Sequence, residues 1–312
     1  MAYQLQEINR RIRTDVQEFL AECDRAYAQR VSLAADRILS NLSRSPIVLL
    51  SGPSGSGKTT TALKIAEELQ RRGVNSHAVA MDNYFKTLNR KTAPRTPDGD
   101  IDYESPLCMD MDLLDKHFTA LSAGEEIVIP KFEFARQMRN DAAGVPLKLG
   151  KNEIAIFEGI HALNDDIAGR HPEATKLYIS ARSNVNEGAA LRFKGTWMRL
   201  TRRAVRDYNF RGTGVDETLE MWVNVRRGEK LYISPFKNRA DIIFDSSLPY
   251  EVSVMRNYAV PILQSVPEEN ERHDELLQLI DAFEHFEPID PDLVAKDSLL
   301  REFIGGGSYH YH

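Results

Sequence analysis

The chain has 312 residues and a formal net charge of −6, from 40 Lys and Arg against 46 Asp and Glu. This balance argues against a general binder of nucleic acid or of anionic membranes, because both activities need an excess of positive charge. Two cysteines, Cys23 and Cys108, indicate no disulfide framework, no apolar run is long enough to span a bilayer, and the amino terminus lacks a signal-peptide pattern. We therefore expect a cytoplasmic protein whose partners include neither nucleic acid nor membrane.

The first predicted element is helical. Residues 3–42 contain no proline or glycine and place apolar side chains at steps of three and four, which predicts an amphipathic helix or a pair of helices. The apolar stripe serves one of two purposes. It packs the segment on the main domain, which is the interpretation we favour, or it forms a homo-oligomer.

The most informative stretch is a complete phosphate-loop motif, Gly-Pro-Ser-Gly-Ser-Gly-Lys-Thr at residues 52–59. Residues 47–50 before it predict a buried strand, and residues 60–72 after it predict a helix that stops at Gly73. In such a loop, backbone N–H groups and the helix N-terminus bind phosphate oxygens, the lysine reaches the β/γ-phosphates and the final hydroxyl holds Mg²⁺. The predicted nucleotide ligands are Gly52, Ser54, Gly55, Ser56, Gly57, Lys58, Thr59 and Thr60.

Two further strands end in carboxylates. Residues 76–81 predict a strand that delivers Asp82, and residues 153–159 predict a buried strand that ends at Glu158. Ligands of open parallel sheets lie just outside the carboxyl ends of the strands. Asp82 there either takes a proton from an acceptor hydroxyl or caps a turn, and Glu158 stands where phosphate-loop enzymes hold Mg²⁺ or its water.

Residues 86–152 are too long for a single connection and predict a subdomain. It should contain a mobile loop at 90–102, a helix at 112–121 and β structure at 127–134, with residues 146–149 nearby. The alternation in this β structure puts the rings of Phe132 and Phe134 on one face. The two rings belong either to the core or to a platform that stacks on a planar base.

The second half predicts strands at 176–180 and 241–244 and an arginine-rich helix between them. Arg199, Arg202, Arg203 and Arg206 share one helix face, and Arg211 follows. Such a stripe is either a solvated face, with Arg203 and Asp207 as an ion pair, or a lid that closes on phosphate. We favour the lid, because clustered guanidinium groups repel one another unless an anion faces them.

After a helix at 216–230, the carboxyl-terminal part predicts helices at 250–263, 274–286 and 291–303. The last begins with Asp290 as N-cap and Pro291 at its first position. The glycine-rich stretch 304–308 is expected to free the tail. The tail Tyr309-His310-Tyr311-His312 contains a bare His-x-His pattern, which is weak evidence for a metal site. We therefore expect the tail to be disordered.

Taken together, these segments resemble the uridine kinase/phosphoribulokinase family of phosphate-loop kinases over residues 46–250. The resemblance is carried by the phosphate loop and by Met81-Asp82-Asn83-Tyr84-Phe85, Tyr103-Glu104-Ser105-Pro106, Ile129–Phe134, Phe157-Glu158-Gly159-Ile160, Arg202–Asp207 and Pro235–Asp241. Residues 250–307 resemble the tail of a larger bacterial group of uridine kinase-like nucleoside kinases. Members of that group often carry an amino-terminal module similar to part of threonyl-tRNA synthetase, which this chain lacks.

The resemblance implies an α/β fold in which a parallel sheet with flanking helices carries an acceptor subdomain and an arginine-rich lid. The expected segments are a helical segment 1–45, a kinase domain 46–250 with its acceptor subdomain at 86–152 and its lid at 195–215, and a helical extension 251–312.

It also implies roles for individual residues. Asp82 would be the base on a 5′-hydroxyl, Glu158 and Thr59 would hold Mg²⁺, and Glu104 would hold ribose hydroxyls. Lys58, Arg206 and Arg211 would act in catalysis, and Arg203 would bind ATP. The implied substrate contacts are Tyr84, Phe85, Glu104, Phe132, Phe134, Gln137, Arg206 and Arg211. Phe132 and Gln137 stand where the family has a tyrosine and a histidine that read a pyrimidine base.

We therefore expect an ATP- and Mg²⁺-dependent kinase of a nucleoside 5′-hydroxyl, similar to uridine/cytidine kinase. One alternative is a phosphoribulokinase-like or other small-molecule kinase, because Lys131, Arg136 and Arg139 could bind a phosphorylated acceptor. Another is a non-catalytic nucleotide switch that signals through residues 3–42.

Overall fold

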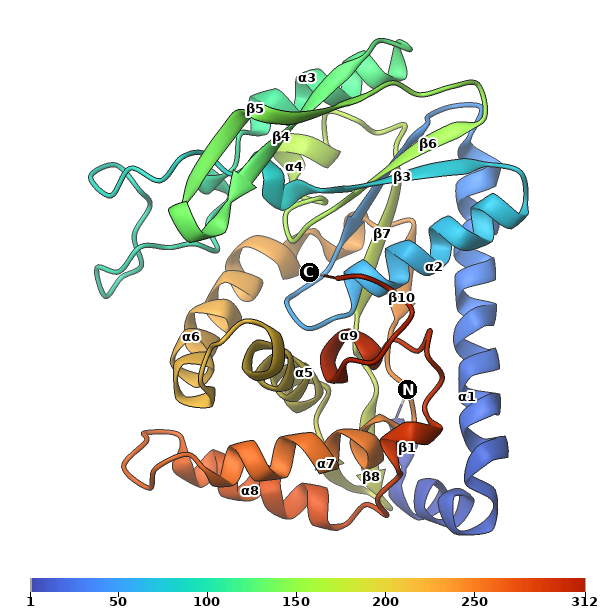
Figure 1. Cartoon of the computed structure of the whole chain (residues 1–312), viewed down its shortest axis with the longest axis vertical. Helices are drawn as coiled ribbons and strands as arrows, with labels where there is room; N and C mark the ends of the chain where they lie inside the picture. Colours follow the sequence, from blue (N-terminus) through green and yellow to red (C-terminus); the bar gives the residue numbers. More distant parts are fainter. Residues whose placement is uncertain (1, 312) are drawn as a thin grey trace.

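The computed structural model describes residues 2–311 and is built around a five-stranded parallel sheet (Figure 1). In sheet order the strands are β10 (Ile242–Asp245), β7 (Thr175–Ser180), β2 (Ile47–Ser51), β6 (Glu153–Glu158) and β3 (Asn75–Ala80). Each strand is a segment that the sequence predicts. The predicted fold class, an α/β phosphate-loop sheet with flanking helices, is confirmed.

The helices cover both faces of this sheet (Figure 1). They are α1 (Leu5–Asn41), α2 (Lys58–Arg71), α3 (Met111–Ser122), α4 (Asp165–Ala168), α5 (Gly195–Phe210), α6 (Val215–Gly228), α7 (Glu251–Gln264), α8 (His273–Glu284) and α9 (Arg301–Ile304). Among the described residues, no helix is long and apolar enough to cross a membrane.

Alternation along β2 divides the interior into two hydrophobic clusters. Val48 and Leu50 point into the cluster that contains α1, α2 and the carboxyl-terminal helices. Ile47 and Leu49 point the other way, toward α3 and α4. Since neighbouring side chains of a strand face opposite sides of the sheet, the fully apolar run of β2 marks a strand buried on both faces.

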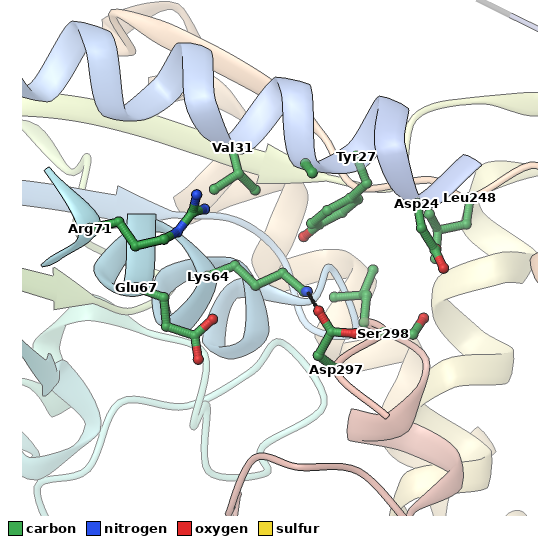
Figure 2. Close-up of a pocket in the computed structure, with 11 residues that line it drawn as sticks. Asp24, Tyr27, Val31, Lys64, Glu67, Arg71, Leu248, Asp297 and Ser298 are labelled. Carbon is green, nitrogen blue, oxygen red and sulfur yellow. Dashed lines mark hydrogen bonds and ion pairs between the residues drawn. The ribbon is translucent and has the colours of Figure 1, made fainter. Parts of the chain in front are cut away.

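Helix α1 packs along the molecule rather than away from it. Its apolar stripe is buried against α2 and the sheet, and Tyr27 and Val31 point from it toward α2 (Figure 2). The Tyr27 hydroxyl lies 2.7 Å from Thr61 Oγ1 of α2. The helix is interrupted at Asp15, whose φ of −159° and ψ of 92° are extended. The structure thus gives the apolar stripe of residues 3–42 the packing role that we favoured.

The segment 86–152 contains an antiparallel hairpin of β4 (Ile127–Glu133) and β5 (Met138–Leu147). The sequence analysis expected residues 146–149 near the β structure at 127–134. Leu147 pairs with Ile127, so the end of that segment closest to β5 belongs to the partner strand. The hairpin turns at Gln137, the one described residue other than glycine with a positive φ, at 50°. The hairpin and α3 lie at the end of the molecule opposite α7 and α8 (Figure 1).

A second, small sheet has no counterpart in the sequence analysis. Its strands are β1 (Ala2–Gln4), β8 (Asn184–Glu187) and β9 (Ala190–Phe193), and β1 pairs with β8 in parallel. Strands of three or four residues carry too little alternation to be recognised from sequence.

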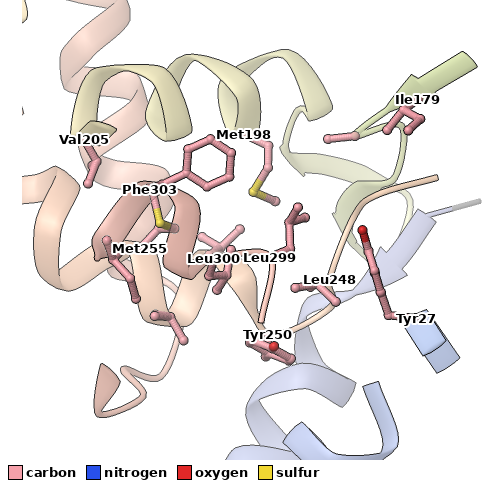
Figure 3. Close-up of a cluster of buried hydrophobic side chains, with 14 of the residues drawn as sticks. Tyr27, Ile179, Met198, Val205, Leu248, Tyr250, Met255, Leu299, Leu300 and Phe303 are labelled. Carbon is pink, nitrogen blue, oxygen red and sulfur yellow. The ribbon is translucent and has the colours of Figure 1, made fainter. Parts of the chain in front are cut away.

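The predicted helix at 291–303 is wrong. The chain forms a short 3₁₀ turn at Pro291–Leu293, with Asp290 as the predicted N-cap, and only the short α9 follows. Tertiary contacts replace helical bonds in between. Leu299 and Leu300 enter the core beside α5, where Phe303 also packs (Figure 3).

The expectation of a free tail is also wrong for the residues that the structure describes. The Ser308 amide donates to the Lys296 carbonyl over 2.8 Å, and the Tyr309 hydroxyl donates to Glu67 on α2 over 2.6 Å. Among the described residues no group of three or more His, Cys, Asp or Glu side chains has the geometry of a metal site. His312 lies outside the described residues.

Candidate active site

A cleft of about 460 Å³ opens beyond the carboxyl ends of β2, β3 and β6. It lies between the phosphate loop, helix α5 and the β4–β5 hairpin. The predicted site residues that line it are Ser54, Gly55, Gly57, Lys58, Thr59, Asp82, Phe85, Glu104, Phe132, Phe134, Gln137, Glu158, Arg203, Arg206 and Arg211. The fold therefore brings together residues that are up to 157 positions apart in the chain, from Ser54 to Arg211.

The phosphate loop requires glycine at its tightest points. Gly55 has a φ of +72°, and a Cβ there would lie 2.6 Å from the Arg199 carbonyl oxygen. Gly57 has a φ of +77° and leaves no room for a Cβ beside Leu299. Any side chain at either position would strain the backbone as well as collide with a neighbour.

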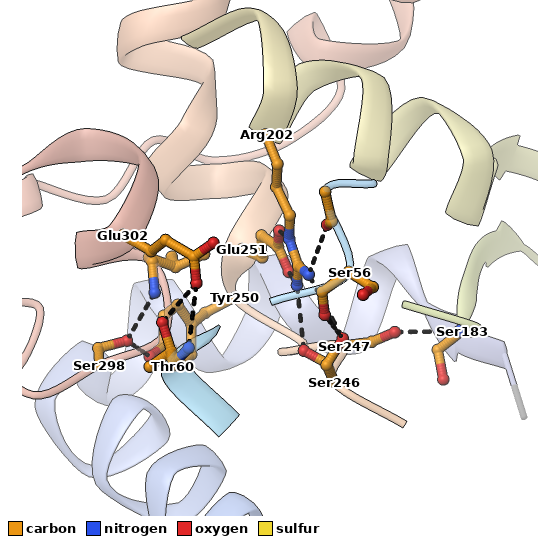
Figure 4. A network of polar contacts seen from close by, with 12 residues as sticks. Ser56, Thr60, Ser183, Arg202, Ser246, Ser247, Tyr250, Glu251, Ser298 and Glu302 are labelled. Atoms are coloured by element: carbon orange, nitrogen blue, oxygen red, sulfur yellow. Dashed lines mark hydrogen bonds and ion pairs between the residues drawn. The ribbon is translucent and has the colours of Figure 1, made fainter. Parts of the chain in front are cut away.

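Two polar groups hold the loop from the side away from the cleft (Figure 4). Arg202 donates to the Gly55 carbonyl over 3.2 Å, and the Ser246 hydroxyl donates to the Ser56 carbonyl over 2.6 Å. A trans peptide directs its C=O and the next N–H in opposite directions, so the bond from Ser246 points the Gly57 N–H away from that side. The loop is thus preorganised for an anion.

At the start of α2, Lys58 and Thr59 face the carboxylate of β6. Thr59 Oγ1 lies 3.4 Å from Glu158 Oε1, and Lys58 Nζ donates to the Pro53 carbonyl over 3.4 Å. Mg²⁺ typically binds one or two protein oxygens and completes its shell with water and substrate phosphate. A hydroxyl and a carboxylate side by side in a phosphate cleft fit that donor set.

The cleft raises the pKa of all three of its predicted carboxyl groups. Burial raises the pKa of Glu158 to about 7, against the attraction of Lys58 and with a contribution from Asp82. Burial also raises the pKa of Glu104 to about 7, opposed first by Arg203. The pKa of Asp82 is raised because the cleft walls desolvate its charge, although Lys58 and Arg211 favour the carboxylate. Carboxyl groups with a pKa of about 7, such as Glu158 and Glu104, are suited to exchange protons near neutral pH.

Helix α5 and Arg211, the residue that follows it, bring three arginines to the cleft, and they share one carboxylate. Arg203 Nε, Arg206 Nη2 and Arg211 Nη1 lie 3.2, 2.9 and 3.5 Å from the Asp207 carboxylate. Arg203 also donates to Ser54 Oγ over 3.0 Å. The stripe is therefore not a solvated face, and the predicted Arg203–Asp207 pair is present.

The other two arginines of the stripe point elsewhere. Arg199 is buried, donates to the Ser54 carbonyl and pairs with Glu229 at 2.7 Å. Arg202 is fully buried and pairs with Glu251. The expectation that the whole stripe faces a bound anion is corrected for these two residues, because each is paired with a buried protein carboxylate.

The far end of the cleft is aromatic. The ring centroid of Phe132 lies 5.6 Å from that of Phe85 and 5.1 Å from that of Phe134, both in edge-to-face contact. Phe134 is 61% exposed, so its ring is not part of the core. Gln137 donates to the Tyr103 hydroxyl over 3.3 Å at the same end. These groups offer flat apolar faces with two hydrogen-bonding side chains beside them.

Four predicted residues do not line the cleft. Tyr84 is buried in the core with its hydroxyl 2.9 Å from His117 Nδ1, which corrects the expected substrate contact. The 3₁₀ turn at Met81–Tyr84 explains this, since it turns Asp82 outward and Tyr84 inward. Gly52, Ser56 and Thr60 belong to the loop and first helical turn but lie behind the cleft surface.

Seven residues that line the cleft were not assigned to it from the sequence. They are Lys86, Leu88, Tyr103, Cys108, Gly159, Ile160 and Glu302. Five of them lie within a few residues of predicted ligands, so the neighbourhood of the motifs was a usable signal for Lys86, Leu88, Tyr103, Gly159 and Ile160. Glu302 lies 242 positions from Thr60, its partner, and no local pattern connects them.

The strand order, the phosphate loop on the central strand and the two carboxylates at the ends of β3 and β6 define a phosphate-loop nucleotide-binding protein with a kinase-like cleft. The model of the "Phosphoribulokinase / Uridine kinase family" matches residues 47–253. The chain belongs to this family, and it is a kinase of the uridine kinase/phosphoribulokinase type.

Known relatives agree with this classification. Uridine kinases of Staphylococcus aureus strains JH9 and Newman are each 27% identical over 209 residues, which cover 67% of this chain and 91% of the relative. A solved structure of a proposed fructose transport system kinase from Silicibacter sp. TM1040 is 20% identical, with a TM-score of 0.51 over 69% of this chain and 98% of that chain. The structural likeness shows the fold.

Proposed function

We propose that the protein phosphorylates the 5′-hydroxyl of a nucleoside, with ATP as phosphoryl donor and Mg²⁺ as cofactor. One observation carries the proposal: a single cleft joins a phosphate loop and a cluster of arginines at one end to a wall of three phenylalanines at the other. The charged end suits a nucleotide triphosphate, and the aromatic end suits a planar base. Asp82 lies in the same cleft as both.

In this proposal Asp82 takes the proton of the attacking hydroxyl. The hydroxyl oxygen forms a bond to the γ-phosphorus, and the bond from that phosphorus to the bridging oxygen breaks, so that ADP leaves with the bonding electrons. A pKa raised by the cleft walls makes Asp82 a better proton acceptor than a solvated aspartate. Lys58 and the arginines that share Asp207 face the charge of the transferred group.

Thr59 and Glu158 would hold Mg²⁺. The ion supplies positive charge that neutralises phosphate oxygens and orients the triphosphate. In the free protein burial raises the pKa of Glu158 to about 7. A cation beside this carboxyl group would favour its ionised form.

In this proposal Glu104 binds ribose hydroxyls. Gly228 of α6 allows its close approach, since a Cβ on that glycine would lie 2.3 Å from the Glu104 Cβ. Asp102, two residues earlier, accepts from Arg227 and from the Tyr232 hydroxyl at 2.9 and 3.0 Å. These contacts attach the loop that carries Glu104 to α6 and the turn that follows it.

An acceptor that is already phosphorylated finds less support. The cations that would have bound it, Lys131, Arg136 and Arg139, are not among the residues that line the cleft. Arg136 pairs with Glu133 at 3.0 Å, and Arg139 pairs with Asp110 at 2.6 Å. We therefore place a nucleoside ahead of a sugar phosphate.

The direct test is ATP consumption with Mg²⁺ against uridine, cytidine, purine nucleosides, ribulose 5-phosphate and pantothenate, with products identified by mass. We expect a nucleoside 5′-monophosphate. Turnover of ribulose 5-phosphate or pantothenate alone would overturn the nucleoside assignment. Nucleotide binding without turnover of any acceptor would instead favour the non-catalytic switch.

A further inference from the structure

The carboxyl-terminal residues 294–311, here called the strap, cross the start of α2 on the nucleotide side of the molecule. Lys64 of α2 pairs with Asp297 of the strap at 2.6 Å, as Figure 2 shows. Leu299 fills the space beside Gly57 that a side chain would need. Phe303 is fully buried, with the Arg202 guanidinium 5.4 Å from its ring centroid. The strap is thus anchored on the phosphate loop itself.

One strap residue reaches the anion-binding end of α2. Glu302 Oε2 accepts from Thr60 Oγ1 at 2.5 Å and lies 3.4 Å from the Thr60 amide nitrogen (Figure 4). Glu302 is 6% exposed, and it lines the same cleft as Lys58 and Glu158. The carboxylate therefore lies inside the proposed nucleotide site.

The donors that Glu302 occupies are those that a phosphate needs. Helix α2 starts at Lys58, so the amide of Thr60 belongs to the first turn and has no partner within the helix. The next amide, of Thr61, already donates to the Gly57 carbonyl over 3.0 Å. The first turn of α2 contains no acidic residue of its own, so the carboxylates at this helix end come from other segments: Glu158 of β6 lies beside Thr59, and Glu302 of the strap lies beside Thr60.

The charges of the cleft explain why the carboxylate is tolerated there. Five cations line it, namely Lys58, Lys86, Arg203, Arg206 and Arg211. Four carboxyl groups face them, namely Asp82, Glu104, Glu158 and Glu302. A triphosphate that enters this cleft adds several negative charges beside a carboxylate that holds one of its donors, and like charges at such a distance repel.

On the basis of the function proposed above, we propose that Glu302 is a built-in competitor of the nucleotide: its carboxylate occupies the position of a phosphate at the start of α2 and leaves when the nucleotide binds. The fraction of molecules in which Glu302 has left Thr60 then limits the apparent affinity for nucleotide. The strap in this way sets the nucleotide concentration at which the enzyme becomes active.

Two other roles for Glu302 make different predictions. As a permanent cap of α2, it would stabilise the fold and leave affinity for phosphate unchanged. As a ligand of the ribose hydroxyls, it would strengthen binding of a nucleotide but not of a phosphate chain alone. Full-length Glu302→Gln separates the three roles, because it removes the charge and keeps the shape of the side chain.

The experiment is calorimetric titration of wild type and Glu302→Gln with Mg²⁺–ADP and, separately, with tripolyphosphate. We expect the variant to bind both ligands more tightly, by at least about fivefold, the lower end of common coupling effects. Asp297→Asn is the matched control, because it removes a strap carboxylate that pairs with Lys64 outside the cleft. It should leave both affinities within about twofold of wild type, well below that coupling.

Equal or weaker binding of both ligands by Glu302→Gln would overturn the inference and leave the kinase assignment intact. Weaker binding of ADP with unchanged tripolyphosphate would replace it with the ribose role. If wild type bound neither ligand, the proposed function would fail together with the inference. Should the variant misfold, hydrogen exchange of wild type decides: ADP must speed exchange in residues 299–304, and protection there would contradict displacement.

Discussion

Helix α5 carries two kinds of arginine, and the comparison between them explains how one helix serves both the fold and the site. Arg199 and Arg202 are buried, and each pairs with a buried carboxylate. Glu251 serves Arg202, and Glu229 serves both Arg199 and Arg226 of α6. The three arginines at the cleft share a single partner, Asp207, as described above. Each buried arginine is thus held by a carboxylate of another segment, whereas the three arginines at the cleft have one shared carboxylate among them.

This difference decides what each group can do. A guanidinium with its own buried carboxylate is fixed in place, and Arg202 uses its remaining donors to hold the Gly55 carbonyl of the phosphate loop. A group of three guanidinium ions with one carboxylate binds a further anion favourably, because each added negative charge relieves their mutual repulsion. The sequence pattern is the same in both cases, and only the partners differ.

The largest effect is expected when a buried arginine loses its carboxylate partner. Glu251→Gln leaves the Arg202 charge without a counter-ion in the core, and we expect it to lower the free energy of unfolding by about 3–5 kcal/mol. Urea unfolding followed by circular dichroism measures this. Glu7→Gln, which breaks the exposed pair with Arg10, is the control and should match wild type. A loss below about 1 kcal/mol for Glu251→Gln would mean that the pair does not anchor the helix.

For the arginines at the cleft we expect the opposite: a mutation should lower kcat and leave stability unchanged. Arg211 has a half-exposed side chain, so Arg211→Met should keep the unfolding midpoint of wild type. Its kcat should fall by about 10²–10³-fold, because a positive group that faces the transferred phosphoryl group is lost. Arg25→Met, at an exposed position on α1, is the matched control for kcat. A stability loss without a kinetic effect would place Arg211 with the structural arginines.

A smaller effect follows from the raised pKa of Glu158, which burial takes from 4.5 to about 7. Between these values the unfolded chain holds fewer protons than the folded one, so this group makes the protein less stable as the pH rises. Glu158→Gln lacks that penalty. Its melting temperature relative to wild type should increase from pH 5 to pH 8 in the absence of nucleotide.

Glu153 on the same strand supplies a control of opposite sign. Its pKa is lowered, first by a hydrogen bond from the Gly150 amide, so its ionised form stabilises the fold above its ordinary range. Glu153→Gln should therefore lose melting temperature relative to wild type as the pH rises toward 4.5, and the difference should stay constant from about pH 5 to pH 8. A difference for Glu158→Gln that stays constant with pH would contradict the desolvation of its carboxylate.

Local sequence predicted much of the nucleotide end of the site. The phosphate loop is a contiguous motif, and Asp82 and Glu158 follow apolar strands whose parallel arrangement brings their ends together. The sequence could not separate Arg202 from Arg203, because neighbours on one helix face differ only in the carboxylates that other segments supply. It also could not place Tyr84, since the irregular turn after β3 follows neither of the two regular periods.

The largest errors concern the carboxyl-terminal strap. The apolar residues of 291–303 have spacings that a helix would also produce, but Val294, Leu299 and Phe303 enter the core from a chain that turns between them. The Ser298 amide donates to the Ala295 carbonyl over 3.1 Å in that turn, and its hydroxyl lies 3.1 Å from the Tyr250 hydroxyl. Contacts between residues so distant in the chain override local propensity, and a single sequence does not record them.

The most direct test of the account is the turnover of Asp82→Asn with Mg²⁺–ATP and the nucleoside that wild type prefers. Asparagine keeps the size of the side chain but cannot accept the hydroxyl proton. We predict that kcat falls by about 10²–10⁴-fold, the usual contribution of a general base, while the affinity for ATP stays close to that of wild type. Near-normal turnover would contradict the central claim that this cleft transfers a phosphoryl group to a hydroxyl activated by Asp82.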